Sequence, residues 1–212
     1  MKPRNFIAAL ACLAALAAAA PALAGSCAPT PALPTKHYPG PANIAPGNNL
    51  RMPAGKAVES SDGQRVVIYG TLLDNNCVPI SDARIEIWQV DPFGKWLLAT
   101  GEDLVDARPV FAGTGRTYTG NDGTFRFITS FPGVAEKRAP HFDLRIKMEG
   151  QKDFDTAIYF ADDGRNASDP VLSKLKPEDR RKLNMQVNEA GGEGLGAGIT
   201  LVMPYKASYR GY

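Results

Sequence analysis

The sequence predicts an all-β protein: a β-sandwich with an extended N-terminal arm and one short helix. From Arg65 onward, short runs rich in Val, Ile, Phe and Tyr alternate with clusters of turn residues, the pattern of sandwiches and barrels. Before that point, residues 26–64 are dense in Pro, Gly and Asn and lack periodicity. The chain has 212 residues, of which 44% are hydrophobic and 22% charged, and this composition suits one globular domain with a closed core.

Residues 1–24 have the pattern of a cleaved secretion signal. Lys2 and Arg4 precede an apolar run, and Ala22 and Ala24 form the small-x-small site of a signal peptidase. The run of about 15 apolar residues is shorter than the ~20 that span a bilayer. We therefore expect a secreted or periplasmic protein with no membrane association beyond this signal.

The charge of the mature chain argues against nucleic-acid binding. Lys2 and Arg4 leave with the signal, and the remaining basic and acidic residues are then equal in number. The sequence also has no Lys/Arg stripe interleaved with aromatic residues, which is the usual footprint of nucleic-acid binding.

The cysteines predict one disulfide. Cys12 leaves with the signal, so Cys27 and Cys77 are the mature pair in an oxidising compartment. A bond between them would close a 50-residue loop and stabilise the fold by roughly 4 kcal/mol on the chain-entropy argument. The alternative is two unpaired thiols.

The elements follow from local patterns. Residues 25–64 form the arm and residues 65–212 the sandwich domain. Pro177 to Met185 carry the one helical signal, with acidic residues in the first turn and basic residues after them. The expected strands are 65–73, 83–90, 94–100, 124–129, 141–149, 156–161 and 198–204.

The expected strand at 141–149 carries the clearest chemical signal. It alternates strictly, so His141 and Asp143 lie on the face opposite its apolar residues. An imidazole and a carboxylate two residues apart on a strand can converge on a first-row transition metal. The alternative is an ordinary polar strand face that continues through Arg145 and Lys147.

Several motifs, in this order, resemble the intradiol ring-cleavage dioxygenases, the family of protocatechuate 3,4-dioxygenase and catechol 1,2-dioxygenase. The resemblance covers most of the mature chain and implies a β-sandwich whose site is built from strands and loops. The motifs that carry it are 74–89, which ends in Trp88-Gln89, then 111–116, 122–127, Pro132-Gly133, Arg138-Ala139-Pro140-His141 and 156–160.

The resemblance implies a non-haem ferric ion held by two tyrosinates and two histidines, but only one of these ligands is kept. The two tyrosine positions correspond to Trp96 and Val134, and the two histidine positions to His141 and Asp143. The arginine that steers the substrate corresponds to Arg138. Because Trp and Val side chains cannot coordinate a metal, the ordinary ferric mechanism is not expected here.

Two hypotheses follow. In the first, a pocket around Arg138, His141, Asp143 and Trp96 binds a small catechol-like aromatic molecule. There, non-haem iron or another transition metal at His141 and Asp143 would support oxidation. A further donor or pocket residue would come from His37, Tyr118, Val134 or Tyr159. In the second, the protein has no cofactor and is a catalytically silent β-sandwich that binds a small ligand or a protein. The resemblance also allows an oligomer, although the sequence has no heptad pattern that would predict one.

Overall fold

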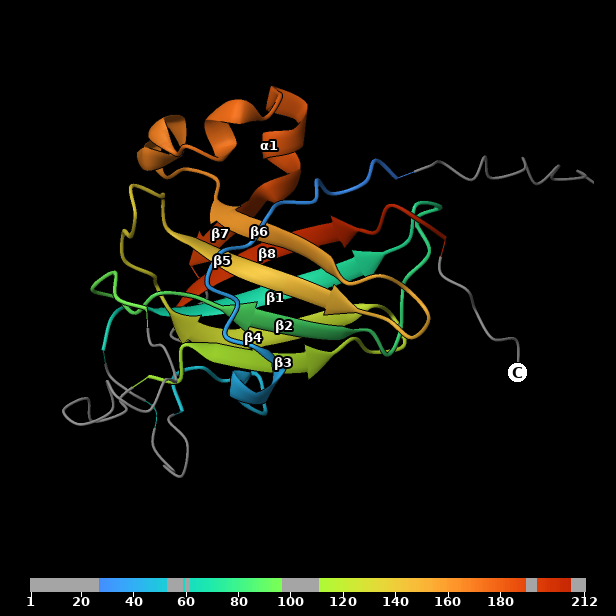
Figure 1. Ribbon diagram of the computed structural model, residues 1–212, viewed down its shortest axis with the longest axis horizontal. Coiled ribbons are helices and arrows are strands. Elements are labelled where there is room, and N and C mark those ends of the chain that lie inside the picture. The colour runs from blue at the N-terminus through green and yellow to red at the C-terminus, as the bar shows by residue number, and fades with distance from the viewer. Residues whose placement is uncertain (1–26, 53–58, 60–61, 97–110, 190–193, 207–212) are drawn as a thin grey trace, which may run out of the picture.

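The computed structural model describes residues 27–52, 59, 62–96, 111–189 and 194–206 (Figure 1). The all-β prediction is confirmed. The strands are β1 (Arg65–Leu73), β2 (Arg84–Trp88), β3 (Thr114–Tyr118), β4 (Thr124–Ser130), β5 (His141–Lys147), β6 (Phe154–Phe160), β7 (Asn184–Glu189) and β8 (Leu195–Val202). The helices are one α-helix, α1 (Pro177–Leu183), and the short 3₁₀ turns η1 (Pro41–Asn43), η2 (Gly164–Ser168) and η3 (Leu172–Lys174).

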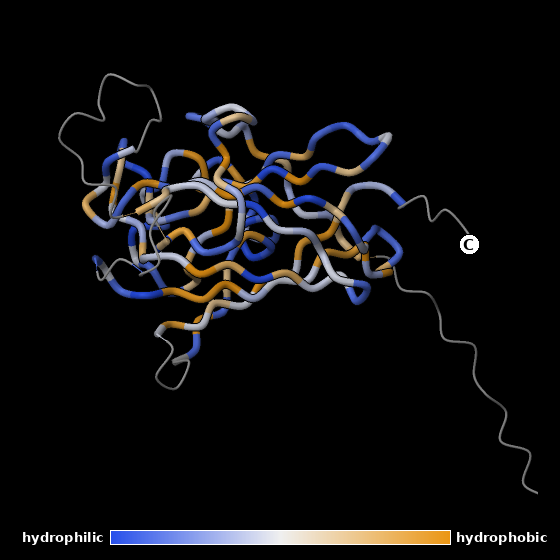
Figure 2. The backbone as a smooth tube through the Cα atoms, turned by 90° about the horizontal axis from the view of Figure 1, so that it is seen from below, coloured by the Kyte–Doolittle hydropathy of each residue, from blue (hydrophilic) through white to orange (hydrophobic). Residues whose placement is uncertain are grey.

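The strands pair in the order β3-β2-β5-β6-β7-β8-β1-β4. The β6–β7 link is short, because only Tyr159 and Phe160 pair with Asn184 and Met185. The order therefore divides into two four-stranded layers joined at one corner, with apolar side chains between them. Hydrophobic residues gather in the strands and hydrophilic ones in the turns (Figure 2).

Alternation along the strands explains the core. On β5, Phe142, Leu144 and Ile146 are fully buried and belong to the main hydrophobic cluster. The residues between them face the other side of the layer, where the arm lies. The same strand therefore supplies both the core and the polar site.

The arm is part of the packed structure. Its segment 47–50 lies between the two ends of the strand order. There Gly47 O accepts from Arg116 N of β3 at 2.8 Å, and Asn48 O accepts from Ile128 N of β4 at 2.8 Å. Leu50 is fully buried in the main cluster. The Pro-rich stretch thus closes the sandwich and does not hang free of it.

The predicted disulfide is confirmed. Cys27 and Cys77 are bonded, with their Cα atoms 5.2 Å apart, and Cys27 N donates to Asn75 O at 3.1 Å. The bond fixes the start of the arm to the turn after β1. The expected signal, residues 1–24, lies outside the described residues. In the described part of the chain, the helices are too short or too polar to span a bilayer.

Four elements differ between the prediction and the structure. The strand predicted at 94–100 is wrong where it is described, since only Trp96 makes an isolated bridge, to Val90; residues 97–100 lie outside the described part. Strands β3 and β7 were not predicted. The β3 sequence, TGRTY, lacks the apolar alternation that marks a strand, and the β7 sequence, NMQVNE, alternates only through Met185 and Val187, the first of which was assigned to the helix. The helix ends at Leu183, where β7 begins directly.

Candidate functional site

Strand β5 places His141 and Asp143 on one face. Asp143 is flanked by Trp88 on β2 and Ala157 on β6, and His141 pairs with Tyr159 on β6. His141 is 7% exposed and Asp143 3%. Burial of charged or titratable groups is costly, so this pair marks a special environment.

The hydrogen bonds of His141 define its tautomer. Its Nδ1 lies 2.7 Å from Ala139 O, and because a carbonyl can only accept, Nδ1 carries the proton. Nε2 is therefore turned toward Asp143 Oδ2, 3.7 Å away, which is too far for a hydrogen bond. In the neutral imidazole this places two acceptors face to face. Such a pair is complementary to a hydroxyl donor or to a cation.

Arg138 is fixed beside this pair by two partners. Its Nε donates to Asp169 Oδ2 at 2.9 Å, and its Nη2 donates to the Tyr159 hydroxyl. Burial alone lowers the pKa of Arg138, but Tyr159 and Asp169 outweigh it and raise the pKa above its ordinary value. The guanidinium therefore stays charged. Burial also raises the pKa of the Tyr159 hydroxyl, which stays neutral.

Asp169 is a functional residue that sequence reasoning missed. It is fully buried; its Oδ2 also accepts from Ala139 N at 2.9 Å, and its Oδ1 accepts from the backbone N–H groups of Val171 and Leu172. It lies far along the chain, in a loop with no motif. The sequence cue was faint: an Asp followed by Pro before a short helical turn.

The arm closes the site from outside. His37 stacks on Trp96 with ring centroids 4.7 Å apart, and its Nε2 lies 2.5 Å from Glu136 Oε1. Trp96 Nε1 is buried and has no hydrogen-bond partner within the described part of the chain. The space left to water between these side chains is about 10 Å³, enough for about one water-sized group. It is lined by Lys36, His37, Trp96, Ala135, Glu136, Arg138, His141 and Asp143.

The backbone at this cavity is unusual. His37, Glu136 and Lys137 have φ of 57°, 51° and 63°, in the left-handed region that residues with a side chain rarely adopt. Backbone held in such regions is concentrated at functional sites, where the surroundings impose it. Here it sets the contact between the arm and the loop before Arg138.

The structure brings five of the sequence-predicted residues together at this cavity: His37, Trp96, Arg138, His141 and Asp143. Two others lie elsewhere. Val134 is 48% exposed and does not line the cavity, because its neighbour Ala135 occupies that place in the loop. Tyr118 is 54% exposed at the end of the outer strand β3 and is not among the lining residues.

Comparison with known proteins identifies the family. Residues 39–199 match the family described as Dioxygenase (Dioxygenase_C). The chain is 37% identical over 130 residues to the protocatechuate 3,4-dioxygenase alpha chain of Burkholderia cepacia, covering 59% of this chain and 64% of that one. It is 29% identical over 137 residues to a putative dioxygenase of Rickettsia felis, with 61% and 64% covered. The match thus spans slightly less than two thirds of these curated relatives. The chain belongs to the intradiol ring-cleavage dioxygenase family.

Solved structures agree on the fold. The dioxygenase domain of a dioxygenase carbohydrate-binding protein fusion from Streptomyces sp. SirexAA-E superposes with a TM-score of 0.66 at 25% identity, over 84% of this chain and all of that one. An intradiol ring-cleavage dioxygenase from Tetranychus urticae gives a TM-score of 0.62 at 20% identity, over 86% and 98%. The latter supports the fold alone.

The residues present do not fit the ferric site that the family implies. The two tyrosine positions of the family correspond to Trp96, which lines the cavity, and Val134, which does not, and neither side chain can donate a lone pair to a metal. In the described part of the chain no three His, Cys, Asp or Glu side chains gather as a metal-binding group. His141 and Asp143 supply two donors, fewer than the four of the family's ferric site.

Proposed function

We propose that the protein is an exported member of the intradiol dioxygenase family that binds a catechol-like aromatic compound at the cavity of Trp96, Arg138, His141 and Asp143. The observation that carries the proposal is the complementarity of this cavity to a hydroxyl group. A hydroxyl both donates and accepts. The cavity faces it with the acceptors of His141 and Asp143, the charged donors of Arg138 and the unpartnered N–H of Trp96.

The aromatic ring of such a ligand requires the arm to move. The space of about 10 Å³ takes a hydroxyl, whereas a ring needs the place now filled by His37 against Trp96. In the bound state Asp143 accepts a hydrogen bond from the ligand hydroxyl, and Arg138 stabilises negative charge on the ligand oxygen. The Trp96 ring then forms the wall against which the ligand ring packs.

Export is supported by the sequence pattern of residues 1–24 and by the Cys27–Cys77 disulfide. Structural disulfides persist in oxidising compartments and are rare in the cytosol. Mass spectrometry of the mature protein recovered from the periplasm or medium should give an N-terminus at Gly25. Retention of residues 1–24 would contradict export through cleavage of this signal.

A second candidate function is metal-dependent oxidation. It is favoured by the hydrogen bond from His141 Nδ1 to a backbone carbonyl, which orients Nε2 as metal-ligating histidines are oriented. His141 and Asp143 would hold a transition metal such as iron or copper, which when bound would polarise the ligand oxygens. Elemental mass spectrometry tests it. Near-stoichiometric metal that disappears in both His141→Ala and Asp143→Ala supports this candidate, and metal-free protein after reconstitution removes it.

Titration with 4-nitrocatechol, whose absorbance reports ionisation of its hydroxyls, tests the main proposal. We expect saturable binding to the wild type and at least about a tenfold loss in Arg138→Met, since hydrogen bonds to a charged group are strong. The matched control is Arg165→Met, because that guanidinium is half exposed and pairs with Asp163. Nitrobenzene, which lacks the hydroxyls, should not bind. Failure of 4-nitrocatechol to bind, or equal binding by both arginine variants, would leave the fold as a module for another small ligand or a protein.

A further inference from the structure

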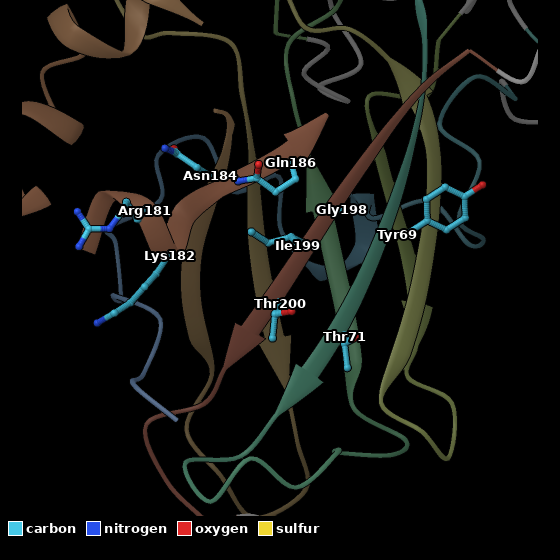
Figure 3. A pocket seen from close by; sticks show the side chains of 9 residues that line it. All are labelled: Tyr69, Thr71, Arg181, Lys182, Asn184, Gln186, Gly198, Ile199 and Thr200. Carbon is cyan, nitrogen blue, oxygen red and sulfur yellow. The ribbon is translucent and has the colours of Figure 1, made fainter. Parts of the chain in front are cut away.

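A second hollow lies on the other layer of the sandwich, away from the cavity at His141. It has a volume of about 500 Å³, within the range of small-molecule sites. It lies over the outer faces of β7, β8 and β1 and reaches the end of α1 (Figure 3). Nothing in the proposed catechol site uses these residues.

The hollow exists because β8 has a glycine at its centre. Gly198 is paired with Tyr69 of β1 on one side and Gln186 of β7 on the other. A Cβ at Gly198 would meet only Gln186 O, at 3.9 Å, so the space above it is open. The row Tyr69-Gly198-Gln186 crosses three strands, about 10 Å in width. The Tyr69 ring therefore forms one rim of the hollow, the Gly198 backbone forms its floor, and the Gln186 amide forms the other rim.

Apart from Ile199, the remaining lining consists of hydrogen-bonding side chains, with positive charge at one end. Thr71 and Thr200 are paired on adjacent strands below the row, and Asn184 Oδ1 is buried without a partner among the described residues. Arg181 and Lys182 stand at the α1 margin. The guanidinium of Arg181 has no ion pair within the described part of the chain, and Lys182 pairs with Asp179. Among the residues that the structure describes, no carboxylate lines the hollow.

We infer that this face binds a short acidic carbohydrate, such as an oligomer of uronic acids. Hydroxyls and amides on a flat sheet match the many hydroxyls of a sugar, because each can donate or accept. The Tyr69 ring, 44% exposed with Arg126 on one side at 5.5 Å, offers an amphipathic surface for a sugar ring. Carboxylates at the other end meet Arg181 and Lys182, which gives the site its preference for an anion.

Calorimetric titration of the mature protein with trigalacturonate, and with maltotriose as an uncharged α-1,4 trisaccharide, tests this inference. We expect trigalacturonate to bind and maltotriose to bind at least about tenfold more weakly. Gly198→Val, which suits a strand and fills the floor, should lower affinity by about tenfold or more. Tyr69→Ala should do the same, whereas Phe93→Ala, at an aromatic residue that is 76% exposed elsewhere, should not. Arg181→Gln should weaken trigalacturonate alone, by about threefold, because exposed charges contribute little.

Each contrary result has a definite meaning. Absence of trigalacturonate binding, or undiminished binding in both Gly198→Val and Tyr69→Ala, overturns the site. Equal affinity for the two trisaccharides overturns the acidic ligand. Sedimentation that shows a dimer dissociated by Tyr69→Ala would instead make this face an interface between two copies. Melting temperatures of the variants separate loss of the site from loss of the fold.

Discussion

The cavity at His141 and the hollow over Gly198 show that the volume of a site and the number of charged groups in it need not go together. The hollow over Gly198 is about 500 Å³, whereas the cavity at His141 and Asp143 leaves about 10 Å³ to water. Yet the small cavity holds buried charged groups and left-handed backbone, both of which cost free energy to assemble, and a dense set of hydrogen bonds that offsets part of this cost. The large one is an open sheet face with positive charge at one end, and it exists because Gly198 has no side chain. We therefore expect any reaction to take place at the cavity, and reversible ligand binding at the hollow.

The largest expected effect comes from the disulfide that anchors the arm over the cavity. Cys27→Ser should lower the free energy of unfolding by up to about 4 kcal/mol, because the denatured chain regains the freedom of a 50-residue loop. Chemical denaturation of oxidised protein measures this. The double variant Cys27→Ser/Cys77→Ser should lose no more than the single one, since the bond is broken once. Additive losses would show that the thiols contribute by packing and not by the crosslink.

A slightly smaller loss of stability is expected from substitution of Asp169, the buried carboxylate that holds Arg138 in place. Asp169→Asn leaves the guanidinium of Arg138 without its buried carboxylate and should cost about 3 kcal/mol of unfolding free energy. It should also abolish 4-nitrocatechol binding, because Arg138 loses its position. Asp163→Asn is the matched control: Asp163 likewise accepts from a backbone N–H at the start of a 3₁₀ turn, and its loss should cost about 1 kcal/mol. Equal losses in the two variants would mean that Asp169 only caps its turn.

The pH dependence of stability provides a second test of the role of Asp169. Burial alone raises the pKa of Asp169, but the N–H groups of Leu172 and Val171 and the charge of Arg138 lower it below its ordinary value. A carboxyl with a lowered folded-state pKa stabilises the protein above the unfolded-state pKa, near 4, and this contribution is lost as pH falls through the folded value. We expect the wild type to lose more stability than Asp169→Asn below about pH 4, in denaturation curves at several pH values. Parallel losses would assign the acid sensitivity to other carboxyls.

The sequence predicts a strand where burial of one face makes apolar and polar residues alternate. It does not predict a strand whose conformation depends on pairing with a neighbouring strand. Strand β5 was predictable from the alternating apolar residues Phe142, Leu144 and Ile146. Strand β3 pairs with β2 along its whole length but has polar residues and a glycine, so its strand state comes from its partner. The same division holds at the site. His141 and Asp143 share a strand and were predictable as a pair, whereas Asp169 reaches Arg138 from a distant loop through a contact that no local pattern encodes.

The smallest expected effect on stability falls on the arm contact that closes the cavity. His37→Ala removes the stack on Trp96 and the pairing with Glu136, both of which are partly exposed. Their combined contribution should be about 1 kcal/mol, so the fold survives. The same loss shifts the closed arm toward an open state, and 4-nitrocatechol should associate roughly fivefold faster in stopped-flow mixing. Gly198→Val, in the open groove, should leave this rate at the wild-type value. If His37→Ala changes the rate no more than Gly198→Val does, the arm does not gate the cavity, and an aromatic ligand must enter by another side.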